Sequence, residues 1–167
     1  MTSTDVLRTL EFRHAGEQSL LQYQRLVDAK DLDGLAAMVT DDVLIRRQSS
    51  EQRGREHFLA LYRRFAESDV VRAQHMASNI EVAELEPAAD EVRLRVDSTF
   101  LAITTHRSGE ARQMWGRYRD DVVLRDGRWL LAAKRIDLVG TAFVEESALA
   151  STSVDSFGPR TAWSTDT

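Results

Sequence analysis

The chain has 167 residues and a formal net charge of −5, it contains no cysteine, and 43% of its residues are hydrophobic. This length fits one domain with one core. The lack of cysteine excludes disulfides, thiolate catalysis and cysteine-bound metals. The acidic balance argues against nucleic acid as a partner, because phosphate binding needs clustered positive charge. No apolar run reaches the ~18 residues that a membrane span requires, and residues 1–13 lack a signal-peptide pattern. We therefore expect a cytoplasmic protein without membrane contact.

The first half of the chain carries helical periodicity. Apolar side chains recur at helical spacing from Gly16 onward, which predicts a helix that begins near this residue. Asp33 is a candidate N-cap for a short second helix, Val43–Arg47 alternates like a short strand, and Gln48–Gly54 is expected to be a loop. A third helix is predicted from one apolar stripe, which consists of Phe58, Leu59, Tyr62 and Phe65.

From Val70 onward the apolar period changes from helical to two, which is typical of strands. The dipeptide Asp126-Gly127 is a strong hairpin signal and supports an antiparallel meander. The order of elements predicts the α+β class, with the helices packed on the concave face of a curved, mostly antiparallel sheet. The four long strands are predicted at Val70–Leu85, Glu91–Thr105, Ala111–Leu124 and Arg128–Val139.

Three regions are expected along the chain: an extension at residues 1–15, a domain at residues 16–140 and a tail at residues 141–167. The tail is rich in Ser, Thr and Ala and has no sustained period, yet it contains Phe143, Phe157 and Trp163. It is either a mobile terminus or an arm that lays its aromatic side chains on a partner subunit.

Three stretches resemble the SnoaL-like branch of the nuclear transport factor 2-like superfamily. They are Leu32–Val43, the strand Gln74–Ile80 with its His-x-x-Ser/Thr-Asn pattern, and Gly116–Asp121 with the following hairpin Asp126–Trp129. The resemblance implies a cone-shaped α+β fold that encloses a small-molecule pocket. Relatives include polyketide cyclases, dehydratases, ketosteroid isomerases, epoxide hydrolases, oxygenase small subunits and non-catalytic binding proteins. The resemblance therefore specifies the fold far better than the reaction.

Titratable side chains that face such a pocket are candidates for general acid–base catalysis. His75 lies mid-strand between apolar neighbours, and imidazole transfers protons readily near neutral pH; the alternative is a histidine hydrogen-bonded inside the sheet for structural reasons. Tyr118 and Asp120 share a strand face. A carboxylate there could take a proton from carbon next to a carbonyl, while a phenol stabilises the enolate oxygen. Alternatively, Tyr118 is a core aromatic and Asp120 pairs with Arg117 or Arg135.

The predicted function is cofactor-independent acid–base catalysis on a polyketide-like or polycyclic carbonyl compound, by an isomerase, a lyase such as a dehydratase, or a polyketide cyclase. The alternative is a non-catalytic ligand-binding protein or the small subunit of a ring-hydroxylating oxygenase. The histidines are scattered, without metal-ligand spacing, and there is no glycine-rich phosphate loop, so we expect neither a metal nor a cofactor. The side chains expected to line the pocket are Tyr23, Phe65, Met76, Phe100, Trp115 and Arg135.

The last two long strands carry apolar side chains on both faces, for example Tyr118 against Trp115 and Leu131 against Leu130. A sheet with one solvated face should alternate apolar with polar residues. Because the helices cover one side only, the sequence predicts a homodimer through the convex face. The aromatic residues of the tail are a competing cover for the same face.

Overall fold

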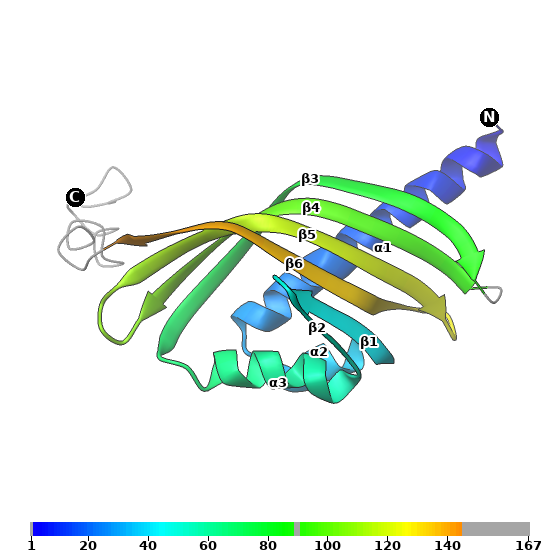
Figure 1. Cartoon of the computed structure of the whole chain (residues 1–167). Coiled ribbons are helices and arrows are strands. Elements are labelled where there is room, and N and C mark those ends of the chain that lie inside the picture. Colours follow the sequence, from blue (N-terminus) through cyan, green and yellow to red (C-terminus); the bar gives the residue numbers. More distant parts are fainter. Residues whose placement is uncertain (1, 89–90, 145–167) are drawn as a thin grey trace, which may run out of the picture.

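A curved sheet arches over three helices in the computed structural model, which describes residues 2–88 and 91–144 (Figure 1). The helices are α1 (Ser3–Asp28), α2 (Leu32–Ala37) and α3 (Arg55–Ala66). The strands are β1 (Val39–Arg47), β2 (Ser50–Arg53), β3 (Val70–Ala88), β4 (Glu91–His106), β5 (Ala111–Arg125) and β6 (Arg128–Val144). All three helices lie on the concave side, so the predicted α+β class and the placement of the helices are confirmed.

The sheet has the strand order β2-β1-β6-β5-β4-β3. Strands β3 to β6 form the predicted antiparallel meander, whereas β1 joins β6 in parallel, with Arg47 opposite Ile136. The prediction of a loop at Gln48–Gly54 is wrong, because Gln48 adopts a left-handed φ of 55° and turns the chain back into β2. All four residues of β2 are exposed, so the sequence shows no apolar alternation there.

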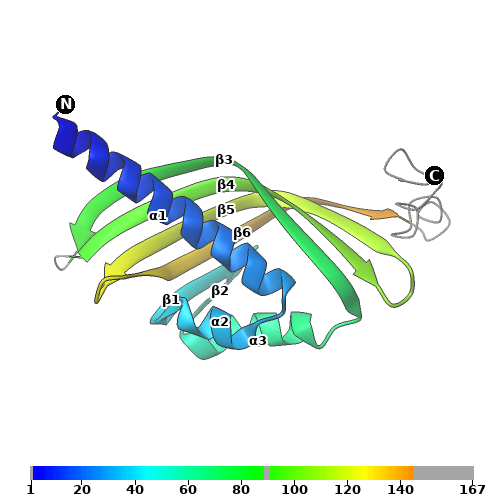
Figure 2. The same ribbon diagram turned by 180° about the vertical axis from the view of Figure 1, so that it is seen from behind.

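Helix α1 begins at Ser3, so the predicted start near Gly16 is wrong. A capping box starts the helix: the Thr2 side chain accepts a hydrogen bond from the Asp5 backbone N–H, and the Asp5 carboxylate accepts one from the Thr2 N–H. The first turns project past the sheet and remain largely exposed (Figure 2). Capping rather than burial therefore defines this end, which is why an apolar stripe does not reveal it.

Helix α2 begins two residues earlier than its predicted cap indicates. The N-cap is Asp31, whose Oδ1 accepts a hydrogen bond from the Gly34 N–H at 2.8 Å, and Asp33 lies inside the first turn. The helix ends before Val39, which belongs to β1. The short α2 therefore leads directly into the strand that flanks β6.

A bulge in β3 contributes to the curvature of the sheet. The register against β4 shifts between Ser78 and Glu81, and Asn79 within this bulge has a φ of 51°. A bulge bends its strand and increases the local twist, so the sheet wraps around α1. The core fills the resulting hollow with fully buried side chains that include Leu35, Phe58, Leu94, Val96 and Val122.

Strand β6 continues past Gly140 to Val144. Phe143 is 63% exposed and lies under the Arg112 guanidinium, 5.5 Å from its carbon to the ring centroid. Phe157 and Trp163 lie outside the described residues, so the role of the tail stays a prediction. Among the helices of residues 2–88 and 91–144, none is long and apolar enough to cross a membrane.

Gly16 marks a close approach of α1 to the sheet and generates a testable prediction. A Cβ at this position would lie 2.8 and 2.9 Å from the γ carbons of Val82 and 3.0 Å from Val96 Cγ2. We expect Gly16→Leu to lower the free energy of unfolding by about 1–3 kcal/mol, the usual cost of overpacking. The control Gln18→Leu, on the exposed side of the same helix, should change it by less than ~0.5 kcal/mol in urea denaturation. Equal stability of the two variants would contradict the described packing.

Candidate active site

A cavity of about 120 Å³ lies between α1, α3 and the concave face of the sheet. An apolar cavity of roughly 150 Å³ is known to hold benzene, so this one encloses about one ring. The lining is mainly apolar and aromatic, with a few polar groups that converge on it, as in many ligand sites. It consists of Tyr23, Val27, Arg47, Leu61, Tyr62, Phe65, His75, Phe100, Ala102, Met114, Tyr118, Ile136 and Leu138.

His75 on β3 is held by Asp28, the last residue of α1. The carboxylate accepts two hydrogen bonds from one residue: the backbone N–H of His75 donates to Oδ2 at 2.9 Å, and the ring Nδ1 lies 2.5 Å from Oδ1. A carboxylate accepts hydrogen bonds, so Nδ1 carries the proton. Nε2 then has its lone pair available on a side chain that lines the cavity. The pair is arranged as a base and its orienting group.

The end of α1 is tied to the start of β3, which places Asp28 beside His75. Lys30 adopts a left-handed φ of 56° immediately after the helix. Its ammonium group donates to the backbone oxygen of Val70 at 2.5 Å and to that of Ala66 at 3.4 Å. Side chain and backbone together therefore fix the helix end against the strand that carries the histidine.

A second histidine–aspartate pair provides an internal comparison. His106 Nδ1 lies 2.8 Å from Asp69 Oδ1, and its Nε2 lies 3.1 Å from the hydroxyl of Thr104. Both ring nitrogens are therefore occupied, and His106 does not line the cavity. His106 fastens the end of the β4–β5 hairpin to the start of β3, whereas His75 keeps one nitrogen for a ligand.

Three tyrosines supply hydrogen-bond donors to the cavity. The hydroxyls of Tyr23 and Tyr62 are 2.9 Å apart, and the Tyr118 ring stacks on Phe100 with centroids separated by 4.2 Å. Burial raises the pKa of Tyr62, and it raises the pKa values of Tyr23 and Tyr118 well above the usual value for a phenol. All three keep their protons at neutral pH. Within the Tyr23–Tyr62 pair, one hydroxyl donates to the other, so the second proton has no acceptor within this pair.

Asp120 does not line the cavity, and its partner is neither Arg117 nor Arg135. Its Oδ2 accepts from the Lys134 ammonium at 2.8 Å, and both side chains are buried. Burial raises the pKa of Asp120 and lowers the pKa of Lys134, and the attraction between the two groups opposes both shifts. The ammonium also lies 3.5 Å from the centroid of the Tyr118 ring. The Asp120–Lys134 pair therefore packs against the aromatic lining on the side away from the cavity.

Five of the side chains predicted at the site meet at this cavity: His75 and Tyr118 from the catalytic set, and Tyr23, Phe65 and Phe100 from the binding set. Their roles in catalysis and binding remain predictions. All five come from α1, α3 and the meander, so the fold assembles them from segments that are distant in the sequence.

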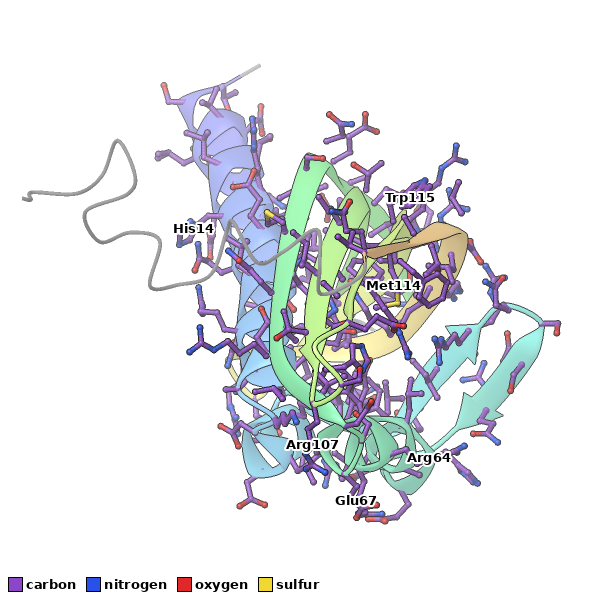
Figure 3. All side chains as sticks on the ribbon, turned by 90° about the vertical axis from the view of Figure 1, so that its left-hand side faces the viewer. His14, Arg64, Glu67, Arg107, Met114 and Trp115 are labelled. Carbon is purple, nitrogen blue, oxygen red and sulfur yellow. The ribbon has the colours of Figure 1, made fainter. Side chains whose placement is uncertain are left out.

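The prediction that Met76, Trp115 and Arg135 line the pocket is wrong. Successive strand residues point to opposite faces of the sheet. Because His75 points into the cavity, the next residue, Met76, points away from it. Met76 and Trp115 lie in a shallow groove on the convex face, and Arg135 binds Asp121 at 3.1 Å. Figure 3 labels the adjacent residues Met114 and Trp115 of β5, which extend to different sides of the strand.

Sequence reasoning missed Asp28, Tyr62 as a polar lining residue, and Arg47. Tyr62 was recognisable on the apolar stripe of α3, and Arg47 alternates with the inward-facing Val43 and Ile45. Asp28 had no signal of its own, because only the tertiary fold brings it to His75. Over the described part of the chain, no three His, Asp or Glu side chains gather as a metal site would need.

The SnoaL-like domain family matches residues 8–135. No curated protein matches the sequence. A protein assigned as a scytalone dehydratase from Novosphingobium aromaticivorans superimposes with a TM-score of 0.71 at 22% identity, covering 85% of this chain and 91% of its own.

Two further solved structures have the same fold. A protein assigned as an aromatic ring hydroxylase from Novosphingobium aromaticivorans gives a TM-score of 0.69 at 18% identity, with 83% of this chain and 97% of the other covered. The hexachlorocyclohexane dehydrochlorinase LinA-type3 from Novosphingobium barchaimii gives 0.64 at 16% identity, with 86% and 94% covered. At these identities the likeness establishes the fold alone.

The buried pair of Asp120 and Lys134 generates a stability prediction. Asp120→Asn leaves the ammonium without its counter-charge, so we expect the free energy of unfolding to fall by about 3–5 kcal/mol. The double variant Asp120→Leu with Lys134→Met should be clearly more stable than Asp120→Asn, because it buries no charge. The exposed pair Asp97–Arg119, at 2.7 Å, is the control, and Asp97→Asn should cost less than ~1 kcal/mol. Urea denaturation measures all three; equal costs for both asparagine variants would contradict the account.

Proposed function

We propose that this chain, which belongs to the SnoaL-like domain family of the nuclear transport factor 2-like superfamily, is an enzyme that removes a proton from carbon in a small cyclic carbonyl compound. The observation that carries the proposal is the Asp28–His75 contact of 2.5 Å at the wall of an apolar cavity. A histidine oriented in this way is equipped to act as a general base. The reaction classes it supports are isomerisation, cyclisation and elimination.

In the proposed mechanism, His75 Nε2 takes a proton from the carbon next to the carbonyl group. The Nδ1–H donates to Asp28, whose charge stabilises the imidazolium that forms. The electron pair of the broken C–H bond moves onto the carbonyl oxygen, and the free hydroxyl proton of the Tyr23–Tyr62 pair donates to this enolate. The imidazolium then returns the proton to another carbon in an isomerisation, or to a departing hydroxyl group in a dehydration.

The size of the cavity limits the substrate. About 120 Å³ encloses one ring, so a polycyclic or polyketide-like compound would have to extend through the mouth. The names of two neighbouring structures, a scytalone dehydratase and a dehydrochlorinase, describe eliminations. Eliminations can begin with the loss of a proton from carbon, so this analogy favours a lyase over the other classes.

Two single-ring compounds test the proposal. Cyclohex-3-en-1-one reports isomerisation and 3-hydroxycyclohexanone reports dehydration, since both yield cyclohex-2-en-1-one, which absorbs in the ultraviolet. We expect the wild-type chain to accelerate at least one reaction. His75→Gln and Asp28→Asn should each lower that rate ~10²–10⁴-fold, the usual contribution of a general base.

The matched control is Asp69→Asn, which removes the corresponding carboxylate from His106 outside the cavity. It should retain activity within ~3-fold, because His106 holds the hairpin and takes no part in proton transfer. Full activity of Asp28→Asn would refute the mechanism. Failure of the wild-type chain on both compounds would favour the rival function, a ligand-binding protein or an oxygenase small subunit.

We also propose a homodimer that forms through a convex patch made of Met76, Leu101, Trp115 and Val139. Trp115 is 41% and Val139 is 64% exposed in the single chain. Exposed apolar patches often mark interfaces, and two-fold association is the commonest way to cover them. Ion pairs such as Arg95–Asp121 occupy the neighbouring part of the convex face, so the patch has a polar border.

Sedimentation equilibrium tests the dimer. We expect a dimer at ~100 μM, a concentration at which an apolar interface of standard size is occupied. Trp115→Glu should yield a monomer, whereas Leu7→Glu, which introduces the same charge at an exposed apolar site on α1, should remain dimeric. A wild-type chain that is monomeric at this concentration would reject the proposal.

A further inference from the structure

We propose that the substrate of this cavity is a single-ring carboxylate whose anionic group binds Arg47 at the mouth. The inference depends on the proposed function in one respect: it takes the cavity as the substrate site. It adds the chemical class of the ligand and the residue that selects it.

Arg47 reaches the cavity through the register of β1 against β6. It lies opposite Ile136, and Ile45 lies opposite Lys134 two residues earlier. Because Ile136 lines the cavity, Arg47 is on the same concave face, and it is itself part of the lining. It is the last residue of β1 before the chain turns at Gln48, and its exposed side chain places it at the rim.

The guanidinium of Arg47 has no anionic partner within the segments that the structure describes. Its neighbour Arg46, on the opposite face, pairs with Asp137 at 3.4 Å. Below the cavity, the charge of Lys134 is matched by Asp120. Arg47 therefore presents a permanent positive charge to the cavity without a matching negative charge from the lining.

The charge of Arg47 also reaches the tyrosine pair. Burial is the largest influence on Tyr62 and raises its pKa, and the positive charge of Arg47 opposes that rise. The Asp120 carboxylate, which does not line the cavity, acts in the opposite direction and raises the pKa of Tyr62 further, so Arg47 is the lining group whose charge favours an anion near this hydroxyl. A ligand anion in this position would receive a hydrogen bond from the phenol and an ion pair from the arginine.

The balance of charge favours a carboxylate. One guanidinium matches one unit of negative charge, and its two parallel N–H groups fit the two oxygens of a carboxylate. A phosphate carries nearly two charges at neutral pH, and the lining adds no second fixed cation for it. The apolar part of the cavity then takes one ring, which leaves the carboxylate at the mouth and ring carbon near His75.

Calorimetric titration of the full chain with cyclohexanecarboxylate and with cyclohexanecarboxamide tests the inference. The two compounds share the ring and differ in charge. We expect the wild-type chain to bind the carboxylate ~10–100-fold more tightly, as for hydrogen bonds to a charged group. Arg47→Gln should remove this preference and leave the affinity for the amide unchanged.

Arg53→Gln is the matched control, since Arg53 is an exposed arginine of β2 in a pocket that Arg47 does not line. It should bind both compounds like the wild type. His75→Gln should keep the preference for the carboxylate, which separates this inference from the fate of the proposed base. The inference is overturned if neither compound binds at millimolar concentration, if Arg47→Gln keeps the preference, or if His75→Gln abolishes it.

Discussion

The contact between Asp28 and His75 joins the helical half of the chain to the sheet, and the site depends on it. β3 is an edge strand, so the outward backbone N–H of His75 has no neighbouring strand to accept it. Asp28 accepts this N–H at 2.9 Å and the ring nitrogen at 2.5 Å. One carboxylate therefore accepts the free N–H at the sheet edge and also orients the imidazole. The position of α1 is thus linked directly to the chemistry of the cavity.

The fold was predictable wherever an element buries one face, because burial then gives the sequence a regular apolar period. The four long strands and α3 all bury one face, and the sequence locates them within a few residues of their observed ends. The N-terminal turns of α1 and the strand β2 were missed because they are exposed and depend on a capping box and on a tight turn at Gln48. The Ser-Asn pair that follows His75 in the family pattern also has a physical reason, since Asn79 adopts the left-handed conformation of the bulge.

The site was predictable only in part, because strand alternation defines faces but not partners. His75 and Tyr118 were correctly expected to share a pocket, whereas Met76 could have been rejected, since a neighbour of His75 must point to the opposite face. Asp28 lies 47 residues before His75, and no local pattern connects the two. The same holds for Lys134 as the partner of Asp120. Tertiary packing alone determines both pairs.

The protonation of the His75 ring is the most direct test of the central claim. Long-range ¹H–¹⁵N NMR spectra of the full chain with ¹⁵N-labelled histidine distinguish a protonated from an unprotonated ring nitrogen. Above the pH at which an imidazole is ordinarily protonated, the account predicts the ring tautomer with its proton on Nδ1, facing Asp28, and a changed pattern in Asp28→Asn while the His106 signals stay in place. A proton on Nε2 in the wild-type chain would contradict it, because no base would then face the cavity.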